Sequence, residues 1–225
     1  MVAGTMSGSG VKKAAKPGKG GRPSQARAEQ IGEEILTIAM RMFLSEGYGA
    51  TSIEAIAQQA GISKRTFYAR FANKADLFKA VVNRLVTQLR PKQVAPLFTG
   101  GTLEEILLRL AAILLRAALM PDALALHRLM IAEAHRFPEL TAILDAQGAR
   151  QEAITRIAAL LEEHAPSTSI GHEKAMMAAE QFMQMVVSIP QRRALGLGVP
   201  MSPEALAEWA TDAVHLFLNG YGLLR

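Results

Sequence analysis

The sequence predicts an all-α protein. Apolar residues recur at helical spacing through most of the chain, helix-start signals are frequent, and no stretch alternates apolar and polar residues as a strand would. Of the 225 residues, half are hydrophobic and a fifth are charged. This balance supports one or two compact domains and excludes a disordered chain.

Composition also excludes several kinds of site. There is no cysteine, so the chain has no disulfide, no thiolate nucleophile and no cysteine-ligated metal. The five histidines are scattered, without a His-x-x-x-His pair or a carboxylate pair at metal spacing, so we expect neither a metal nor a cofactor. No apolar run is long enough for a signal peptide or a membrane span. We therefore expect a soluble cytoplasmic protein.

Charge is distributed unevenly along the chain. Residues 1–27 carry six basic and no acidic side chains, residues 28–90 carry eight basic and six acidic ones, and residues 91–225 carry eleven basic and fourteen acidic ones. The net charge is +5. A basic front joined to a mildly acidic back indicates a polyanion-binding end followed by a part with a different task.

The first elements follow from local signals. Residues 1–23 are rich in Gly, Ser, Ala, Lys and Pro and predict a flexible basic arm. Side-chain caps then predict four helices in quick succession. They are a helix capped by Ser24 that ends at Glu46 before Gly47 and Gly49, one with a Thr51–Glu54 capping box that ends near Ala60, one capped by Ser63 over residues 64–71, and one capped by Asn73 and Asp76 that ends near Leu89.

The remaining chain is also predicted to be helical. Capping pairs, N-terminal prolines and apolar periodicity mark each start. The predicted helices begin at a Thr102–Glu105 capping box, run from Pro121 to about Arg136, from Pro138 to Ala146, over residues 149–164, over residues 172–189 with a stop at Pro190, and from Pro203, capped by Ser202, to Asn219 before Gly220 and Gly222.

Residues 51–78 carry the strongest functional signal. A helix, a tight turn at Gly61 and a second short helix form the helix-turn-helix layout, whose second helix enters the DNA major groove. Apolar residues, including Phe67 and Phe71, would pack this unit. Lys64 and Arg65 are long donors at the helix start, where residues reach base edges. A solvated charged face is the alternative reading of these side chains.

At these residues the sequence resembles the TetR family of bacterial transcriptional regulators, over roughly residues 27–78. The resemblance implies a homodimer that places one recognition helix from each subunit in successive major grooves of a near-palindromic double-stranded operator. It implies base readout by Ser63, Lys64, Arg65 and Thr66, and phosphate contacts by Thr51, Ser52, Tyr68 and Lys74. Many members carry glycine where this chain has Arg65. The arginine is expected to extend the set of bases that the helix reads.

The arm also resembles family members that have a Gly-Arg-Pro stretch ahead of the first helix. In GKGGRP, residues 18–23, Arg22 is a candidate for insertion into the minor groove. A solubilising tail is the alternative. The implied domains are the arm (1–23), the helix-turn-helix domain (24–72), a connecting helix (73–90) and a helical regulatory and dimerisation domain (91–225).

In the family, the last two long helices form the dimer interface. The matching apolar stripes here are Met176 and Ala179, then Leu206, Trp209, Ala213 and Phe217. An intramolecular core is the alternative reading of both stripes. Residues 128–140, RLMIAEAHRFPEL, resemble the AefR-like C-terminal subgroup.

In the family, the helices after the DNA-binding domain form a ligand pocket. Core packing is the alternative reading of the methionines here. The candidates for an adaptable apolar pocket are His127, Met130, Phe182, Met183 and Val186. The sequence thus predicts a DNA-binding repressor released by a small, largely apolar effector. Alternatives are a constitutive or architectural DNA-binding dimer, and an all-helical enzyme, for which no catalytic constellation is visible.

Overall fold

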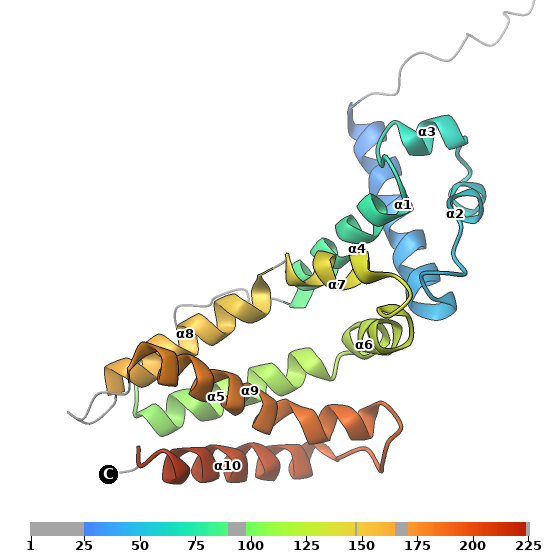
Figure 1. Ribbon diagram of the computed structural model, residues 1–225. Coiled ribbons are helices and arrows are strands. Elements are labelled where there is room, and N and C mark those ends of the chain that lie inside the picture. Colours follow the sequence, from blue (N-terminus) through green and yellow to red (C-terminus); the bar gives the residue numbers. More distant parts are fainter. Residues whose placement is uncertain (1–24, 90–97, 147, 165–170, 224–225) are drawn as a thin grey trace, which may run out of the picture.

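The computed structural model describes residues 25–89, 98–146, 148–164 and 171–223, and within these ranges the chain is helical without a β-strand (Figure 1). The all-α prediction is confirmed. The helices are α1 (Gln25–Glu46), α2 (Ile53–Gln59), α3 (Lys64–Tyr68), α4 (Lys74–Leu89), α5 (Leu103–Ala118), α6 (Pro121–Glu133), α7 (Pro138–Asp145), α8 (Ala149–His164), α9 (His172–Ala194) and α10 (Pro203–Gly220). The predicted arm, which contains Arg22, and the predicted cap Ser24 lie outside the described residues.

Helices α1 to α4 pack around an aromatic core. The rings of Phe43 in α1 and Phe78 in α4 meet edge to face, with centroids 5.4 Å apart. Phe67 of α3 is fully buried in the same cluster. Buried aromatic rings contribute much of the apolar area of a small core, so these three side chains hold the short helices against α1 and α4.

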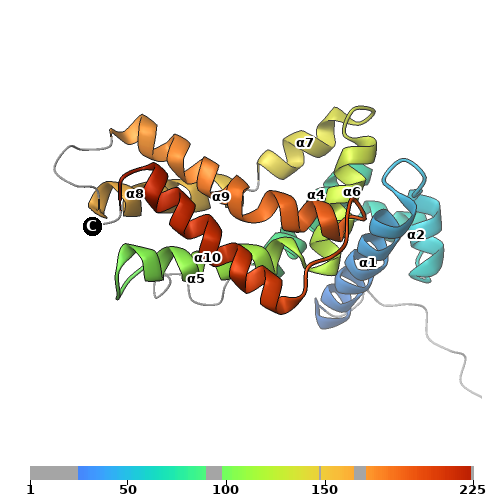
Figure 2. The ribbon, with the colours of Figure 1, turned by 90° about the horizontal axis from the view of Figure 1, so that it is seen from below.

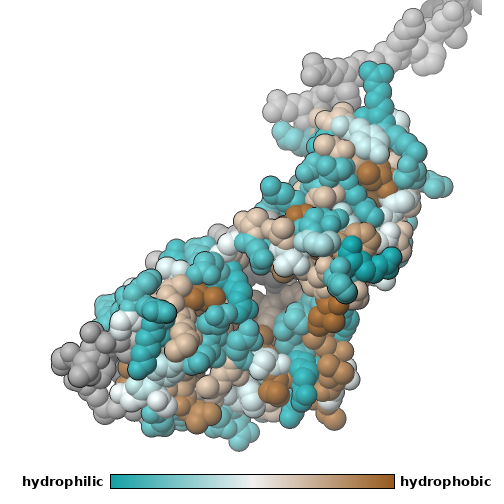
Figure 3. Space-filling view, in the orientation of Figure 1, coloured by the Kyte–Doolittle hydropathy of each residue, from teal (hydrophilic) through white to brown (hydrophobic). Residues whose placement is uncertain are grey.

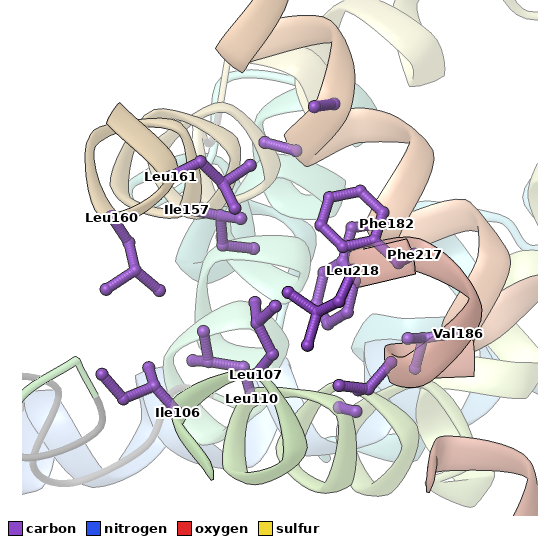
Figure 4. Packing of buried hydrophobic residues seen from close by; sticks show 14 of the residues in the cluster. Ile106, Leu107, Leu110, Ile157, Leu160, Leu161, Phe182, Val186, Phe217 and Leu218 are labelled. Atoms are coloured by element: carbon purple, nitrogen blue, oxygen red, sulfur yellow. The ribbon is translucent and has the colours of Figure 1, made fainter. Parts of the chain in front are cut away.

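Helices α5, α8, α9 and α10 form a second core, and Figure 2 shows them running side by side. Phe182 of α9 and Phe217 of α10 lie with ring centroids 5.1 Å apart. Leu107 of α5 and Ile157 of α8 point toward the same space (Figure 4). These four helices therefore make a bundle held by a continuous apolar interior.

Helices α6 and α7 join the first core, although they lie in the part of the chain predicted to be regulatory. Leu129 of α6 and Leu140 of α7 are buried in the cluster that contains Phe43 and Phe78. Helix α6 packs against α1, and α7 packs along α4 (Figure 1). The two cores therefore do not follow the order of the predicted domains.

Most of the predicted caps are present. Ser63 Oγ accepts the Thr66 N–H, and Ser202 Oγ accepts the Ala205 N–H. The capping box of Thr102 and Glu105 is complete in both directions. Each such cap satisfies backbone donors that a helix start leaves unpaired, which is why these starts are readable in the sequence.

The predicted capping box at Thr51 and Glu54 is wrong by one residue. Ser52 is the N-cap of α2, and its Oγ accepts the Ala55 N–H at 3.1 Å. The Thr51 hydroxyl instead donates to the Gly47 carbonyl at 2.7 Å. The Glu54 carboxylate pairs with Lys64.

Two helices end earlier than predicted. Helix α3 ends at Tyr68, not at residue 71, and α6 ends at Glu133, not at Arg136. In both cases a bond that spans three residues follows the helix end: the Arg70 N–H donates to Phe67 O, and the Arg136 N–H donates to Glu133 O. Such tightened bonds close a last helical turn.

The predicted stop at Pro190 is also wrong, because α9 continues to Ala194. A proline inside a helix lacks the N–H that would bond to the carbonyl four residues earlier. That carbonyl belongs to Val186, and it accepts the indole N–H of Trp209 from α10 at 2.9 Å. A neighbouring helix thus supplies the missing donor, and the helix does not end.

Candidate DNA-binding interface

Helices α2 and α3 form the predicted helix-turn-helix at the end of the molecule far from α10 (Figure 1). Gly61 has a φ of +62°, a left-handed conformation that suits glycine in the tight turn. The Ile62 N–H donates to Ala57 O across this turn. Ile56 of α2 and Phe67 of α3 are buried, so these two side chains mark the inward faces of the helices. The opposite face of α3 therefore points to solvent.

The residues predicted to read bases lie together at the start of α3. Ser63, Lys64 and Arg65 are exposed, and Thr66 is half-buried. The hydroxyls of Ser63 and Thr66 share a hydrogen bond of 2.9 Å. The first turn of α3 is therefore ordered by its own polar side chains, with Lys64 and Arg65 extending beyond them.

Lys64 forms an ion pair that the sequence did not reveal. Its Nζ lies 2.6 Å from Glu54 Oε1 of α2. The hydrogen bond from Lys64 lowers the pKa of the Glu54 carboxyl, and the same bond raises the pKa of Lys64. Both groups are exposed, so this pair orients Lys64 and contributes little to stability.

Among the predicted phosphate contacts, Ser52 and Tyr68 are exposed, and the Tyr68 side chain is 51% accessible. Thr51 is only 1% accessible, and its hydroxyl is bonded to Gly47. A side-chain phosphate contact from Thr51 is therefore incompatible with the structure, and that prediction is corrected. Thr51 is buried because Ser52, and not Thr51, is the N-cap of α2 and occupies the exposed position at the start of that helix.

The Lys74 side chain forms hydrogen bonds within the protein. Its Nζ donates to the carbonyl oxygens of Tyr48 and Thr51, at 2.9 and 3.1 Å, and lies 4.4 Å from the centroid of the Tyr48 ring. Tyr48 is buried, and its hydroxyl faces Glu139 at 3.5 Å. Burial, followed by the charge and hydrogen bond of Glu139, raises the pKa of Tyr48 to about 12.

The predicted pocket residues do not come together. Phe182 and Val186 are fully buried in the bundle core, and Met183 packs against it. Met130 packs against the other core, and His127 is half-buried on α6. Figure 3 shows the surface hollowed between the half that carries α2 and α3 and the half built by the bundle.

Three of the predicted dimer residues belong to the interior of one subunit. Ala179, Ala213 and Phe217 are buried in the bundle core, so they are corrected to intramolecular packing. Met176 and Leu206 are partly buried against the same core, and Trp209 binds Val186.

The apolar residues that face outward are neighbours of the predicted ones. Met177 on α9 is 52% accessible and Leu216 on α10 is 64% accessible. One residue corresponds to about 100° of rotation around a helix. Stripes that included Met177 and Leu216, each one position from a predicted residue, would have found these outward side chains.

Among the described residues, no helix has the combination of length and apolar character that a membrane span requires. No group of three or more His, Cys, Asp or Glu side chains in those ranges is arranged to hold a metal ion.

The chain matches two family profiles. Residues 35–81 match the profile described as bacterial regulatory proteins, tetR family, and residues 105–223 match the one described as AefR-like transcriptional repressor, C-terminal domain. Both resemblances inferred from the sequence are thereby confirmed.

Individual proteins agree with these profiles. The chain is 24% identical over 199 residues to the DNA-binding transcriptional repressor TetR of Mycobacteroides abscessus, covering 86% of this chain and 97% of that protein. It is 40% identical over 66 residues to the HTH-type transcriptional repressor ComR of Escherichia coli, a match that covers 29% of this chain and only 31% of ComR.

Solved structures extend the similarity to the whole fold. A TetR-family transcriptional regulator from Mesorhizobium loti is 30% identical, with a TM-score of 0.71 and coverage of 87% of this chain and 98% of the other. The Flavonoid-responsive Regulator FrrA is 28% identical, with a TM-score of 0.67 and coverage of 85% and 97%.

Proposed function

The chain belongs to the TetR family of bacterial regulatory proteins and is a DNA-binding transcriptional regulator, and from this premise we propose how it reads its operator. It acts as a homodimer in the bacterial cytoplasm and places one α3 from each subunit in successive major grooves of a near-palindromic duplex. The exposed first turn of α3 is the observation that carries this proposal.

Base edges are read by Lys64 and Arg65, with Ser63 and Thr66 beside them. Ser52 and Tyr68 hold phosphates, because both residues are exposed, one at the start of α2 and the other at the end of α3. The Lys74 ammonium has three N–H donors, and it bonds to the carbonyl oxygens of Tyr48 and Thr51. Its phosphate contact uses the donor that these two bonds leave. Arg22 enters the adjacent minor groove; it lies outside the described residues.

The subunits associate through the outer faces of α9 and α10. Met177 and Leu216 are the large apolar side chains of these helices that are exposed, and Met176, Leu206 and Trp209 lie partly buried beside the core that supports them. Burying such side chains between two copies is favourable because their apolar surface leaves water.

We further propose that the regulator is a repressor released by a small, largely apolar effector. The name of FrrA, Flavonoid-responsive Regulator, and the hollow between the two halves of the molecule support this mechanism. The effector would favour a dimer geometry in which the recognition helices no longer match the spacing of the grooves. His127, which is half-buried on α6, and Met130, which packs against the first core, are the candidate effector contacts on α6.

Selection of binding sites from random duplex DNA tests the DNA-reading proposal, with wild type and a Lys64→Ala, Arg65→Ala double variant in parallel. We expect a near-palindromic motif for wild type and a degraded one for the variant, with a loss of about 1–3 kcal/mol at particular base positions. Sequence-blind, salt-sensitive retention by both proteins would contradict base readout.

Thermal unfolding with a panel of flavonoids and other small apolar compounds tests the effector. A compound that binds the folded state raises the melting temperature and, if it is the effector, weakens operator binding. If no compound changes either quantity, the protein is a constitutive DNA-binding dimer. Turnover of a substrate, abolished by a substitution in α6, would instead indicate an enzyme.

A further inference from the structure

The turn between α1 and α2, residues 47–51, is fastened from two sides. From the DNA-binding half, Lys74 Nζ donates to the carbonyl oxygens of Tyr48 and Thr51. From the end of α6, Glu133 Oε2 accepts the N–H of Gly49 at 2.5 Å. A carboxylate acceptor makes this bond stronger than one between neutral groups.

The chain is shaped for this close approach. A Cβ at Gly47 would overlap Glu133 Oε1, and a Cβ at Gly49 would lie 3.1 Å from the ring of Phe137. Gly47 also has a φ of +94°, which favours glycine. Between the two glycines, the Tyr48 ring meets the Phe137 ring edge to face at 5.1 Å. The turn and the α6–α7 corner therefore fit directly against each other.

This turn leads straight into the helix-turn-helix. Ser52, the cap of α2, follows it, and α2 packs on α3. The other chain connection of the α2–α3 pair is the short segment before α4. A displacement of residues 47–51 therefore displaces the start of α2 and, with it, the face that α3 presents.

The middle of α6 contacts the bundle. Arg128 Nη2 donates to Ala194 O at the end of α9, at 3.4 Å. Helix α6 also packs against α5 of the bundle. Helix α6 thus lies between the bundle and the turn that carries the recognition unit.

We infer that Glu133 is a positioning residue for operator recognition, which acts by holding the Gly49 N–H and so fixing the turn that carries α2 and α3. Glu133 itself lies outside the proposed DNA contacts. The inference rests on DNA reading by α3 and adds that the angle of α3 is set from α6.

Substitutions at Glu133 test this role by separating the acceptor from the charge. Glu133→Ala removes both, whereas Glu133→Gln keeps an amide oxygen that can accept the Gly49 N–H. Binding is measured on the duplex recovered by selection and on a scrambled duplex of equal length, well below the melting temperature of each variant. Glu163→Ala, an exposed glutamate on α8, is the control for net charge.

We expect Glu133→Ala to weaken binding to the selected duplex on the order of tenfold. Binding to the scrambled duplex should stay unchanged, because sequence-independent affinity depends on basic side chains facing phosphates. Glu133→Gln should restore most of the loss, and Glu163→Ala should behave as wild type. Hydrogen exchange at the Gly49 amide should accelerate in Glu133→Ala and remain near the wild-type rate in Glu133→Gln.

Two results would overturn the inference while leaving the DNA-binding function intact. Wild-type affinity of Glu133→Ala for the selected duplex would show that the turn needs no external anchor. Tighter binding of both Glu133 variants to both duplexes would show that the carboxylate acts only by repelling DNA. A wild-type protein that selects no motif would instead defeat the proposed operator reading.

Discussion

Glu54 sets the charge that the first turn of α3 presents to DNA. Its carboxylate holds Lys64 at 2.6 Å, so part of the positive charge is neutralised before DNA arrives. We expect Glu54→Gln to tighten binding to every duplex and to steepen the dependence of log affinity on log salt by about one. Affinity measured over a series of salt concentrations checks this.

Glu163→Gln on α8 is the matched control, because it makes the same change of charge far from α3. An unchanged salt dependence for Glu54→Gln would show that Glu54 does not offset the charge of Lys64 when DNA is bound. Loss of sequence preference together with tighter binding would identify Glu54 as a determinant of specificity.

Ionisation of the Tyr48 phenol should lower the free energy of unfolding at alkaline pH. Its pKa is about 12 in the folded protein against 10.0 for an ordinary tyrosine, because the phenol is buried beside Glu139. Well below pH 10.0 the phenol is protonated in both the folded and the unfolded state and adds no pH dependence. Between the two values the unfolded phenol loses its proton first, so the free energy of unfolding falls as pH rises.

Urea unfolding from neutral pH to about pH 11 measures this effect. We expect wild type to lose stability more steeply over the alkaline part of the range than Tyr48→Phe, which has no phenol to ionise. Tyr68→Phe, which alters an exposed phenol, should follow the wild-type curve. Parallel curves for wild type and Tyr48→Phe would contradict the raised pKa.

At the scale of single residues, the sequence indicated which kinds of side chain are present better than which way each side chain faces. The exposed start of α3 was predictable because Phe67 and Phe71 mark the inward side of a short helix. The outward apolar residues of α9 and α10 were missed by one position, since Met176 and Met177 are both apolar and only packing decides which one turns inward. Glu133 was missed because its partner, Gly49, is 84 residues away.

Among the elements, α9 depends on α10 to pass through Pro190. If the indole N–H of Trp209 replaces the missing donor, Trp209→Phe leaves Val186 O unpaired and destabilises the protein by about 1–3 kcal/mol. In a Pro190→Ala background, residue 190 regains an N–H that can bond to Val186 O. The same Trp209→Phe change should then cost less.

A double-variant cycle of urea unfolding measures this difference. Unfolding is followed by circular dichroism, because Trp209 is the only tryptophan and its fluorescence is lost on substitution. Equal costs of Trp209→Phe in the two backgrounds would show that the indole acts by packing alone. Ser202→Ala at the start of α10 is a useful reference, with an expected cost of about 1 kcal/mol from the lost cap.

Helix starts were predictable from sequence because a cap is a local event. Ser63, Thr102 and Ser202 each bond to a backbone N–H three residues ahead. The end of α9 was not predictable, because the partner that rescues Pro190 comes from another helix. Local bonds can be read along the chain, whereas contacts between helices require the fold.

For the whole molecule, dimerisation through α9 and α10 can be tested by placing charge on their outer faces. Met177→Glu and Leu216→Glu should each raise the dimer dissociation constant on the order of tenfold or more, because a buried unpaired carboxylate is costly. Sedimentation velocity over a range of concentrations gives the association state. Binding to a palindromic duplex should weaken in parallel.

Ala159→Glu on α8 places the same charge at an exposed site outside the proposed interface and should leave the dimer intact. If Met177→Glu and Leu216→Glu also sediment as wild type, the subunits associate through another surface. A variant that dissociates yet keeps full affinity for the palindrome would contradict the proposal that operator binding requires the dimer.

The placement of α6 and α7 in the first core limits how such regulators can be recombined. Leu129 and Leu140 complete the apolar interior formed by α1 and α4, although 30 or more residues of bundle and linker separate them from α4 in the chain. A hybrid joined after residue 90 would take the DNA reader from one parent and these two side chains from the other. A DNA-binding domain exchanged between two regulators therefore needs matching α6 and α7 helices as well as a matching α4. The unit to be exchanged is discontinuous in sequence.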